Sequence, residues 1–196
     1  MNISDFKNNI FSILSIILLV FIAVSPAFAA GKSDQNSSAG CRAAILTNED
    51  FLPALLESID EAQSEILMSV FSFKAGKHKN SYPDQIVSHL AKAVKRGVKV
   101  FVVLETTETK TDGLNIQNRK AGRLLEEKGI NVFFDSPHKT THTKLTLIDQ
   151  RLIFLGSHNF TQSALKYNNE ISVLLDRPEL AGSVRNYILK IIKEGK

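Results

Sequence analysis

The chain has 196 residues, 43% of them hydrophobic and 22% charged, which is typical of a globular domain and excludes a low-complexity polymer. A domain of this size can bury a core without disulfides or metals, and the single cysteine excludes a disulfide within the chain. The formal net charge of +4 suits a polyanionic partner such as nucleic acid or an anionic membrane, although many proteins with neither partner share this balance.

Residues 1–29 have the layout of a secretory signal peptide. Lys7 precedes an apolar run over residues 10–24, Pro26 ends that run, and the sequence Ala-Phe-Ala at 27–29 provides a cleavage pattern of small residues. The run is shorter than the ~20 residues that span a bilayer, which favours cleavage after Ala29 over a retained anchor. We therefore expect an exported protein, periplasmic or secreted, with no stable membrane anchor after cleavage.

Residues 30–42 are rich in serine, asparagine and glycine and are predicted to form a polar linker. This linker contains Cys41, which is expected to be a free thiol, a thiol paired between subunits, or simply a small residue where the domain starts. The predicted domain comprises residues 43–196.

Strand and helix patterns then follow one another along the chain. The expected strands lie at residues 42–46, 65–73, 98–104, 130–134, 143–148, 152–155 and 170–175, and the expected helices at about 50–63, 84–96, 116–128 and 178–192. Alternation in the first half indicates βαβ units, whereas Asp149-Gln150-Arg151 suggests an antiparallel hairpin. The pattern predicts one α/β domain with a mixed, largely parallel sheet and helices on both faces.

A histidine and a lysine on the fifth expected strand are the first candidate functional residues. His142 and Lys144 are two residues apart, so on a strand their side chains leave the same face. An imidazole can act as a nucleophile or as an acid and base near neutral pH, and a lysine supplies positive charge for a phosphate oxygen. Because an isolated pair of this kind is usually only a solvated face, the interpretation depends on the residues that follow.

Further polar residues downstream suit the same chemistry. Gly156 permits a sharp turn after the next strand, and Ser157 and Asn159 offer neutral hydrogen-bond donors. Glu170 begins a further strand, where its carboxylate could orient an imidazole and stabilise its protonated form.

Together these residues resemble the signature of the phospholipase D superfamily. Their order is His142-x-Lys144-x4-Asp149, then Gly156-Ser157-x-Asn159, then Glu170, and the resemblance covers roughly residues 43–196. One copy of the motif is present, and small members of the family with one copy are mostly exported bacterial endonucleases and related mitochondrial-surface enzymes. In such members two subunits pair about a twofold axis and each gives half of the active site. The resemblance therefore implies a phospholipase D-like fold, a homodimer and a nucleic acid substrate.

The resemblance also implies a reaction in two steps. His142 of one subunit attacks the phosphorus of a diester and forms a phosphohistidine, and His142 of the other subunit protonates the departing oxygen and then activates water. Lys144 and Asn159 of both subunits would hold the non-bridging oxygens with help from Ser157, while Glu170 would position a histidine. Asp149 is implied to be more structural, anchoring the turn after its strand. Because lysine supplies the charge, no metal and no other cofactor is expected.

Several nearby residues could also matter. His138 lies close enough along the chain to contact substrate, whereas His158, at the variable position of its motif, is expected to be exposed. The phenylalanines on strands, Phe71 among them, are expected in the core rather than as platforms for base stacking. The loop at 75–83 could widen, narrow or cap the substrate groove.

Two other functions stay open. A phospholipase or cardiolipin hydrolase would use the same chemistry, but it should show an apolar rim or an amphipathic helix near the site, and the sequence shows neither after residue 29. A catalytically silent nucleic-acid-binding protein would not need His142, Lys144, Asn159 and Glu170 together. The leading expectation is a metal-independent phosphodiesterase that cleaves DNA, or RNA, without sequence preference.

Overall fold

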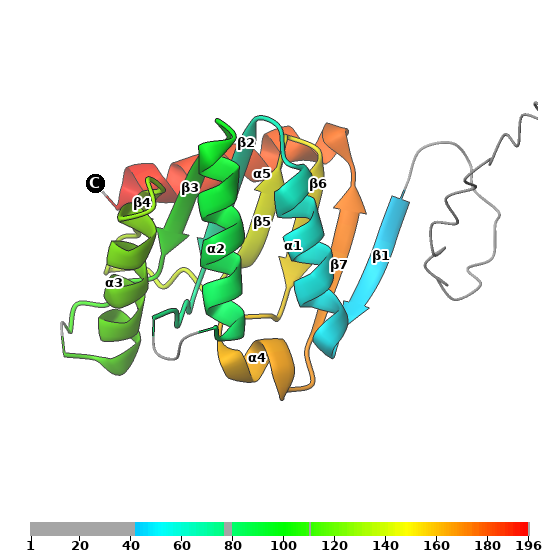
Figure 1. Ribbon diagram of the computed structural model, residues 1–196. Coiled ribbons are helices and arrows are strands. Elements are labelled where there is room, and N and C mark those ends of the chain that lie inside the picture. The colour runs from blue at the N-terminus through cyan, green and yellow to red at the C-terminus, as the bar shows by residue number, and fades with distance from the viewer. Residues whose placement is uncertain (1–41, 77–79, 110, 196) are drawn as a thin grey trace, which may run out of the picture. The chain divides into compact units, whose positions relative to one another are not determined.

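The computed structural model describes residues 42–76, 80–109 and 111–195, so the expected signal peptide, Cys41 and nearly all of the linker lie outside the described residues. The elements in chain order, drawn in Figure 1, are β1 (Arg42–Thr47), the 3₁₀ turn η1 (Asn48–Asp50), α1 (Phe51–Glu61), β2 (Glu65–Val70), α2 (Tyr82–Lys95), β3 (Lys99–Leu104), α3 (Gly113–Glu126), β4 (Asn131–Phe134), β5 (Lys144–Ile148), β6 (Leu152–Gly156), α4 (Gln162–Lys166), β7 (Ile171–Asp176) and α5 (Pro178–Glu194).

These strands form one seven-stranded sheet in the order β1-β7-β6-β5-β2-β3-β4. The prediction of a mixed sheet is confirmed, but the expectation that it is largely parallel is wrong. Only β2–β3 and β3–β4 are parallel, and the other four neighbouring pairs are antiparallel. Parallel neighbours need a crossover connection, which α2 provides from β2 to β3 and α3 from β3 to β4. The helix α1 connects β1 to β2, but these strands are not neighbours in the sheet.

Helices cover both faces of the sheet, as predicted. Ile66, Met68 and Val70 of β2 share one hydrophobic cluster with α1, α2 and α3. Leu67, between them, belongs to a second cluster that contains the inward face of α5. Because successive side chains of a strand point to opposite faces, this division places α1, α2 and α3 in front of the sheet and α5 behind it (Figure 1).

Several element ends differ from the prediction because side chains cap the helices. The helix α2 begins two residues earlier than expected, where Ser81 Oγ accepts a hydrogen bond from the amide of Asp84. Similarly, Asp112 caps α3, which begins at residue 113. The short helix α4 was not predicted, because five residues are too few to show a helical repeat of apolar positions.

The candidate residues other than Asp149 gather where strands end at one edge of the sheet, the lower edge in Figure 1, where α4 also lies. Here β2, β3, β4 and β6 end while β5 and β7 begin. The pairing shows this directly, since Val70 lies opposite both Leu104 and Lys144, and Gly156 lies opposite Ser172. Segments far apart in the sequence therefore meet at this lower edge.

Candidate active site

His142 and Lys144, called the cationic pair below, lie at the lower edge. Lys144 is the first residue of β5, and His142 lies two residues before it. The Nζ atom of Lys144 is 3.3 Å from Nδ1 and 3.4 Å from Nε2 of His142, and it donates to the carbonyl oxygen of His142 at 3.0 Å. An ammonium group can only donate, and the tautomer of His142 sets which ring nitrogen can accept from it. The site thus presents an exposed imidazole beside a positive charge.

The charge on Lys144 is subject to two opposing influences. Burial lowers the pKa of this lysine, because a buried ammonium loses its hydration, and the negative charge of Glu170 acts in the opposite direction. Glu170 therefore helps to keep Lys144 protonated.

An aromatic ring supports both members of the pair. The ring centroid of Phe71 is 4.4 Å from that of His142, and the Nζ atom of Lys144 is 4.9 Å from the centroid of Phe71. Phe71 is half-buried rather than a full core residue. The sequence pattern did not single it out, although its place directly after β2 puts it at the edge where the strands converge.

The backbone around His142 is held against β2. The amide of Phe71 donates to the carbonyl of Thr143 at 2.8 Å, and the hydroxyls of Thr143 and Ser69 are 2.6 Å apart. These contacts extend the β2–β5 pairing beyond the start of β5. His142 is consequently carried by ordered backbone rather than by a free loop.

Glu170 and Ser157 come together as the β6–β7 pairing requires. Ser157 Oγ donates to one oxygen of Glu170, and Asn168 Nδ2 donates to the other at 3.0 Å. The expectation was that Glu170 would orient a histidine, but in the described part of this chain its carboxylate binds Ser157 and Asn168 instead. Its role in positioning a histidine stays a prediction.

Asn159 retains unused hydrogen-bonding capacity. Its Oδ1 atom is buried and receives no hydrogen bond within the described ranges. Buried polar atoms are normally paired, so an unpaired amide atom at the same end of the sheet as His142 and Lys144 is consistent with a binding site. Its role in holding a phosphate stays a prediction.

Gly156 is required for a reason other than the expected sharp turn. A Cβ atom at this position would lie 2.2 Å from Ser172 Oγ and 2.4 Å from Ser172 Cα. Only glycine allows this close approach of β6 to β7, which brings Ser157 opposite the start of β7.

The expectation that His158 is exposed is wrong. The side chain is fully buried, and its ring stacks on Phe51 of α1 with a centroid separation of 4.3 Å. One ring nitrogen pairs with Ser172 Oγ at 2.7 Å and the other with the carbonyl of Asn48 at 3.0 Å. Burial lowers its pKa, against the opposing effects of that carbonyl and of Glu170. His158 is thus a structural residue that points into the core.

His138 lies in the connection between β4 and β5. Its Nδ1 is 2.9 Å from Glu108 Oε1, and both side chains are largely exposed. No contact between His138 and the His142–Lys144 pair is present among the described residues. Its proposed contact with substrate stays a prediction.

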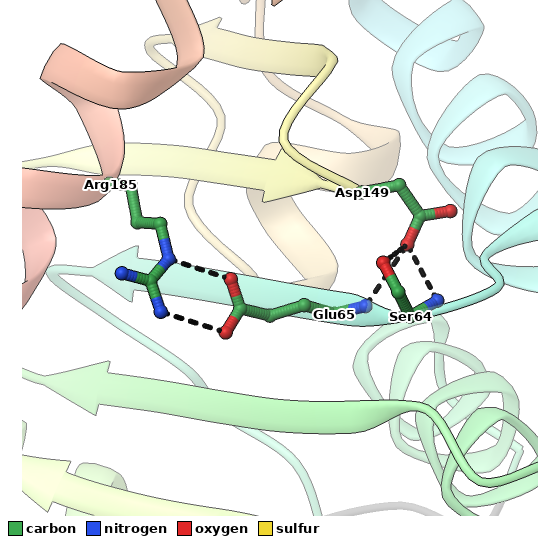
Figure 2. A network of polar contacts seen from close by, with 4 residues as sticks. All are labelled: Ser64, Glu65, Asp149 and Arg185. Atoms are coloured by element: carbon green, nitrogen blue, oxygen red, sulfur yellow. Dashed lines mark hydrogen bonds and ion pairs between the residues drawn. The ribbon is translucent and has the colours of Figure 1, made fainter.

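Asp149 lies at the other end of β5, far from the cationic pair. Five residue steps separate it from Lys144, which corresponds to roughly 16 Å at ~3.3 Å per residue. Its Oδ1 accepts from the amides of Ser64 and Glu65 and from Ser64 Oγ, and its Oδ2 accepts from the amide of Gln63, all within 3.0 Å. Figure 2 shows the contacts of Asp149 with Ser64 and Glu65, together with the two-pronged ion pair from Glu65 to Arg185 of α5.

These contacts give Asp149 a structural part rather than a place at the reacting phosphate. Burial raises the pKa of this carboxyl, but the hydrogen bonds from Glu65, Gln63 and Ser64 outweigh burial and lower it overall. The residue also has a positive φ of 51°, as does Gln150, which forms the tight hairpin turn between β5 and β6. The predicted hairpin is confirmed by the pairing of Ile148 with Leu152.

Among the described residues, no group of three histidine, cysteine, aspartate or glutamate side chains is arranged to hold a metal ion. No helix in the same ranges is long and apolar enough to cross a membrane.

Known proteins resemble this chain in sequence. The chain is 26% identical over 155 residues to a mitochondrial cardiolipin hydrolase from Canis lupus familiaris, which covers 77% of this chain and 54% of that protein. It is 29% identical over 131 residues to a phospholipase D from Rickettsia prowazekii (strain Madrid E), which covers 66% of this chain and 56% of that protein. The chain therefore spans about half the length of these curated relatives.

Solved structures resemble it in fold. Nuc, a phospholipase D family member from Salmonella typhimurium, has a TM-score of 0.67 and 26% identity, covering 80% of this chain and 97% of that chain. NucT from Helicobacter pylori has a TM-score of 0.63 at 20% identity, a likeness of fold that covers 79% of this chain and 98% of that chain.

The family described as "Cardiolipin synthase, PLD-like domain" matches residues 55–192, from α1 to α5. This span is more than half of the chain and contains the candidate site and the strands that build it. The chain therefore belongs to the phospholipase D superfamily.

Proposed function

We propose that the protein is a phosphodiesterase that hydrolyses nucleic acid through a phosphohistidine intermediate. The observation that carries the proposal is the contact between Lys144 Nζ and the imidazole of His142, at 3.3 Å from the nearer ring nitrogen. A nitrogen with a lone pair is a nucleophile for phosphorus, and the adjacent ammonium stabilises the negative charge that develops on the phosphate oxygens.

The reaction proceeds in two balanced steps. In the first, a ring nitrogen of His142 forms a bond to phosphorus while the bond from phosphorus to the leaving oxygen breaks, and a second imidazole protonates that oxygen. In the second, the same imidazole takes a proton from water, the water oxygen bonds to phosphorus, and the phosphorus–nitrogen bond breaks. The products are an alcohol and a phosphate monoester, and both imidazoles return to their starting states.

The second imidazole would be His142 of a second copy of the chain. An apolar strip on the α5 side of the sheet supports such a dimer, and it consists of Ile45, Leu155 and Ile171, which are 62%, 41% and 57% exposed. All three lie on the same face, because Val173 pairs with both Ile45 and Leu155, and Ile171 is two residues from Val173. Ile171 adjoins Glu170, so a partner that covers the strip would lie next to the site.

A nucleic acid substrate is supported by an aromatic side chain near Glu170. Tyr167 is 70% exposed and follows α4, and the ammonium of Lys166 lies 5.4 Å from its ring centroid. An exposed ring can stack on a base and a neighbouring lysine can pair with the backbone phosphate, a combination common in proteins that bind single strands. The names of the curated relatives, a phospholipase D and a cardiolipin hydrolase, favour a phospholipid diester as the second candidate.

A direct test offers three substrates to the purified chain in excess chelator: supercoiled plasmid DNA, RNA, and vesicles that contain cardiolipin. We expect nicking of DNA that His142→Ala reduces at least ~10³-fold, while sedimentation gives the mass of a dimer. His89→Ala is the matched control, since His89 lies on α2 and binds Asp60 of α1. Release of phosphatidic acid with intact DNA would instead establish the lipid hydrolase, and activity that needs added metal would contradict the phosphohistidine route.

A further inference from the structure

Two acidic side chains are buried next to the site without a role in the reaction described above. Glu105 follows β3 and Asp135 follows β4, and each is only 2% exposed. Because β3 and β4 are parallel neighbours, their ends bring these residues together, and a hydrogen bond with Asp135 is one of the causes that raise the pKa of Glu105. A hydrogen bond between two carboxyl groups requires a proton on one of them.

The other hydrogen bonds of the pair show where that proton is needed. Asp135 Oδ1 accepts from the amide of Thr106 at 2.7 Å, and Glu105 Oε2 accepts from the amide of Thr141 at 2.5 Å. Asp135 Oδ2 is buried and receives no bond from any charged donor or amide of the described residues. A proton on Glu105 would supply the missing donor, so one neutral and one ionised carboxyl group satisfy every contact.

The cationic side chains around the pair do not neutralise a second negative charge in place of this proton. From α3, Arg119 donates to Asn115 and to the hydroxyl of Thr106. From α5, Lys190 pairs with Glu194 at 3.6 Å, and both line a small cavity beside Asp135 together with the exposed Lys139 of the β4–β5 connection. The cations that face the pair are thus engaged elsewhere or solvated, and burial of two full negative charges would be strongly unfavourable.

The pair is tied to the proposed nucleophile through Thr141, the residue before His142. Thr143, the residue after it, is bound to Ser69 and Phe71 of the β2 side. The backbone of His142 is therefore held on both sides, by β2 through Thr143 and by Glu105 through Thr141. Loss of the hydrogen bond to Glu105 would release the backbone on the Thr141 side of His142. A displacement of about 1 Å can slow an enzyme ~10²-fold.

We propose that Glu105 is a positioning residue for His142: as a neutral acid that shares its proton with Asp135, it holds the amide of Thr141 and so sets the place of the imidazole. The proposal rests on the proposed function, because His142 is the group whose placement matters.

This arrangement makes the site sensitive to alkali. Burial, and then the hydrogen bond with Asp135, raise the pKa of Glu105 to about 8, while the amide of Thr141 acts in the opposite direction. A raised pKa means that the folded state holds the proton more tightly than the unfolded state. The stability it contributes is complete below about 4.5, the ordinary value, and is lost as the pH rises from there through about 8. Above that pH, two adjacent negative charges repel and weaken the anchor.

The variant Glu105→Gln tests whether the hydrogen bonds of this side chain or its negative charge at high pH affects the site. The amide keeps a donor for Asp135 and an acceptor for Thr141, but it cannot titrate. We expect its kcat at pH 7 to stay within about threefold of wild type, and the fall in kcat above pH 8 to disappear. Glu105→Ala should lower kcat ~10–100-fold with little change in KM. Glu126→Gln, on the exposed face of α3, is the control and should keep the wild-type pH profile.

A readout independent of turnover separates this proposal from the proposed function. The imidazole NMR signals of His142, assigned by their loss in His142→Ala, should shift near pH 8 in wild type and stay still there in Glu105→Gln. Signals that move equally in both proteins, or an unchanged alkaline fall in kcat in Glu105→Gln, would overturn the proposal. A chain that is inactive on every diester but shows the expected NMR behaviour would reject the proposed function and retain the positioning role.

Discussion

The two ends of β5 belong to one sequence motif and have opposite characters. At the Asp149 end, the carboxylate accepts four hydrogen bonds, and the adjoining Glu65 binds Arg185. At the Lys144 end, an imidazole is exposed and the amide of Asn159 has a buried oxygen without a donor among the described residues. Saturated polar groups hold segments together, whereas groups with unused capacity are available to a ligand. The Asp149 end of the motif therefore stabilises the fold, and the Lys144 end is available for chemistry on a ligand.

Lys144→Met should produce the largest effect, and the effect should be on activity alone. The variant keeps the apolar stem over Phe71 and removes the charge, so kcat is expected to fall ~10²–10³-fold while the urea midpoint stays close to that of wild type. Cleavage kinetics and urea unfolding on the same preparation measure the two quantities. Activity within tenfold of wild type would contradict the division between the two ends.

Asp149→Ala should show the reverse pattern. The loss of the carboxylate leaves the amides of Gln63, Ser64 and Glu65 without their acceptor and places alanine at a positive φ. We expect the free energy of unfolding to fall by about 3 kcal/mol, with activity per folded molecule within about threefold of wild type. Gln150→Ala is the matched control, because Gln150 has the same φ of 51° without the carboxylate. Equal losses in both variants would assign the effect to the backbone rather than to the network.

Arg185→Met should produce the smallest effect and again only on stability. The ion pair with Glu65 has good geometry but is partly exposed, so we expect a loss of about 0.5–1 kcal/mol that decreases at high salt. Urea unfolding at low and high ionic strength measures it. A loss as large as that of Asp149→Ala would mean that the attachment of α5, rather than the turn, is the main anchor at this end.

The sequence predicted much of the fold, because strands and helices of ordinary length show their own periodicity. The same periodicity predicted that His142 and Lys144 lie side by side, and their side chains are in contact although His142 precedes the strand. It could not place His158: as the variable position of its motif it was expected at the surface, yet in the structure it stacks on Phe51 of α1, more than a hundred residues earlier. The sequence likewise did not show that Phe71 contacts His142 or that Glu105 binds the amide of Thr141, because each contact joins distant segments.

The sequence by itself determined the order of the elements apart from α4, the hairpin at Asp149 and the membership in the phospholipase D superfamily. Only the tertiary structure decided that most strand pairs are antiparallel, that Glu170 binds Ser157, and that Glu105 meets Asp135 and binds the residue before His142. The physical reason is that the first set depends on interactions between neighbours along the chain. The second set depends on contacts between distant segments, and those contacts leave no repeating pattern in the sequence.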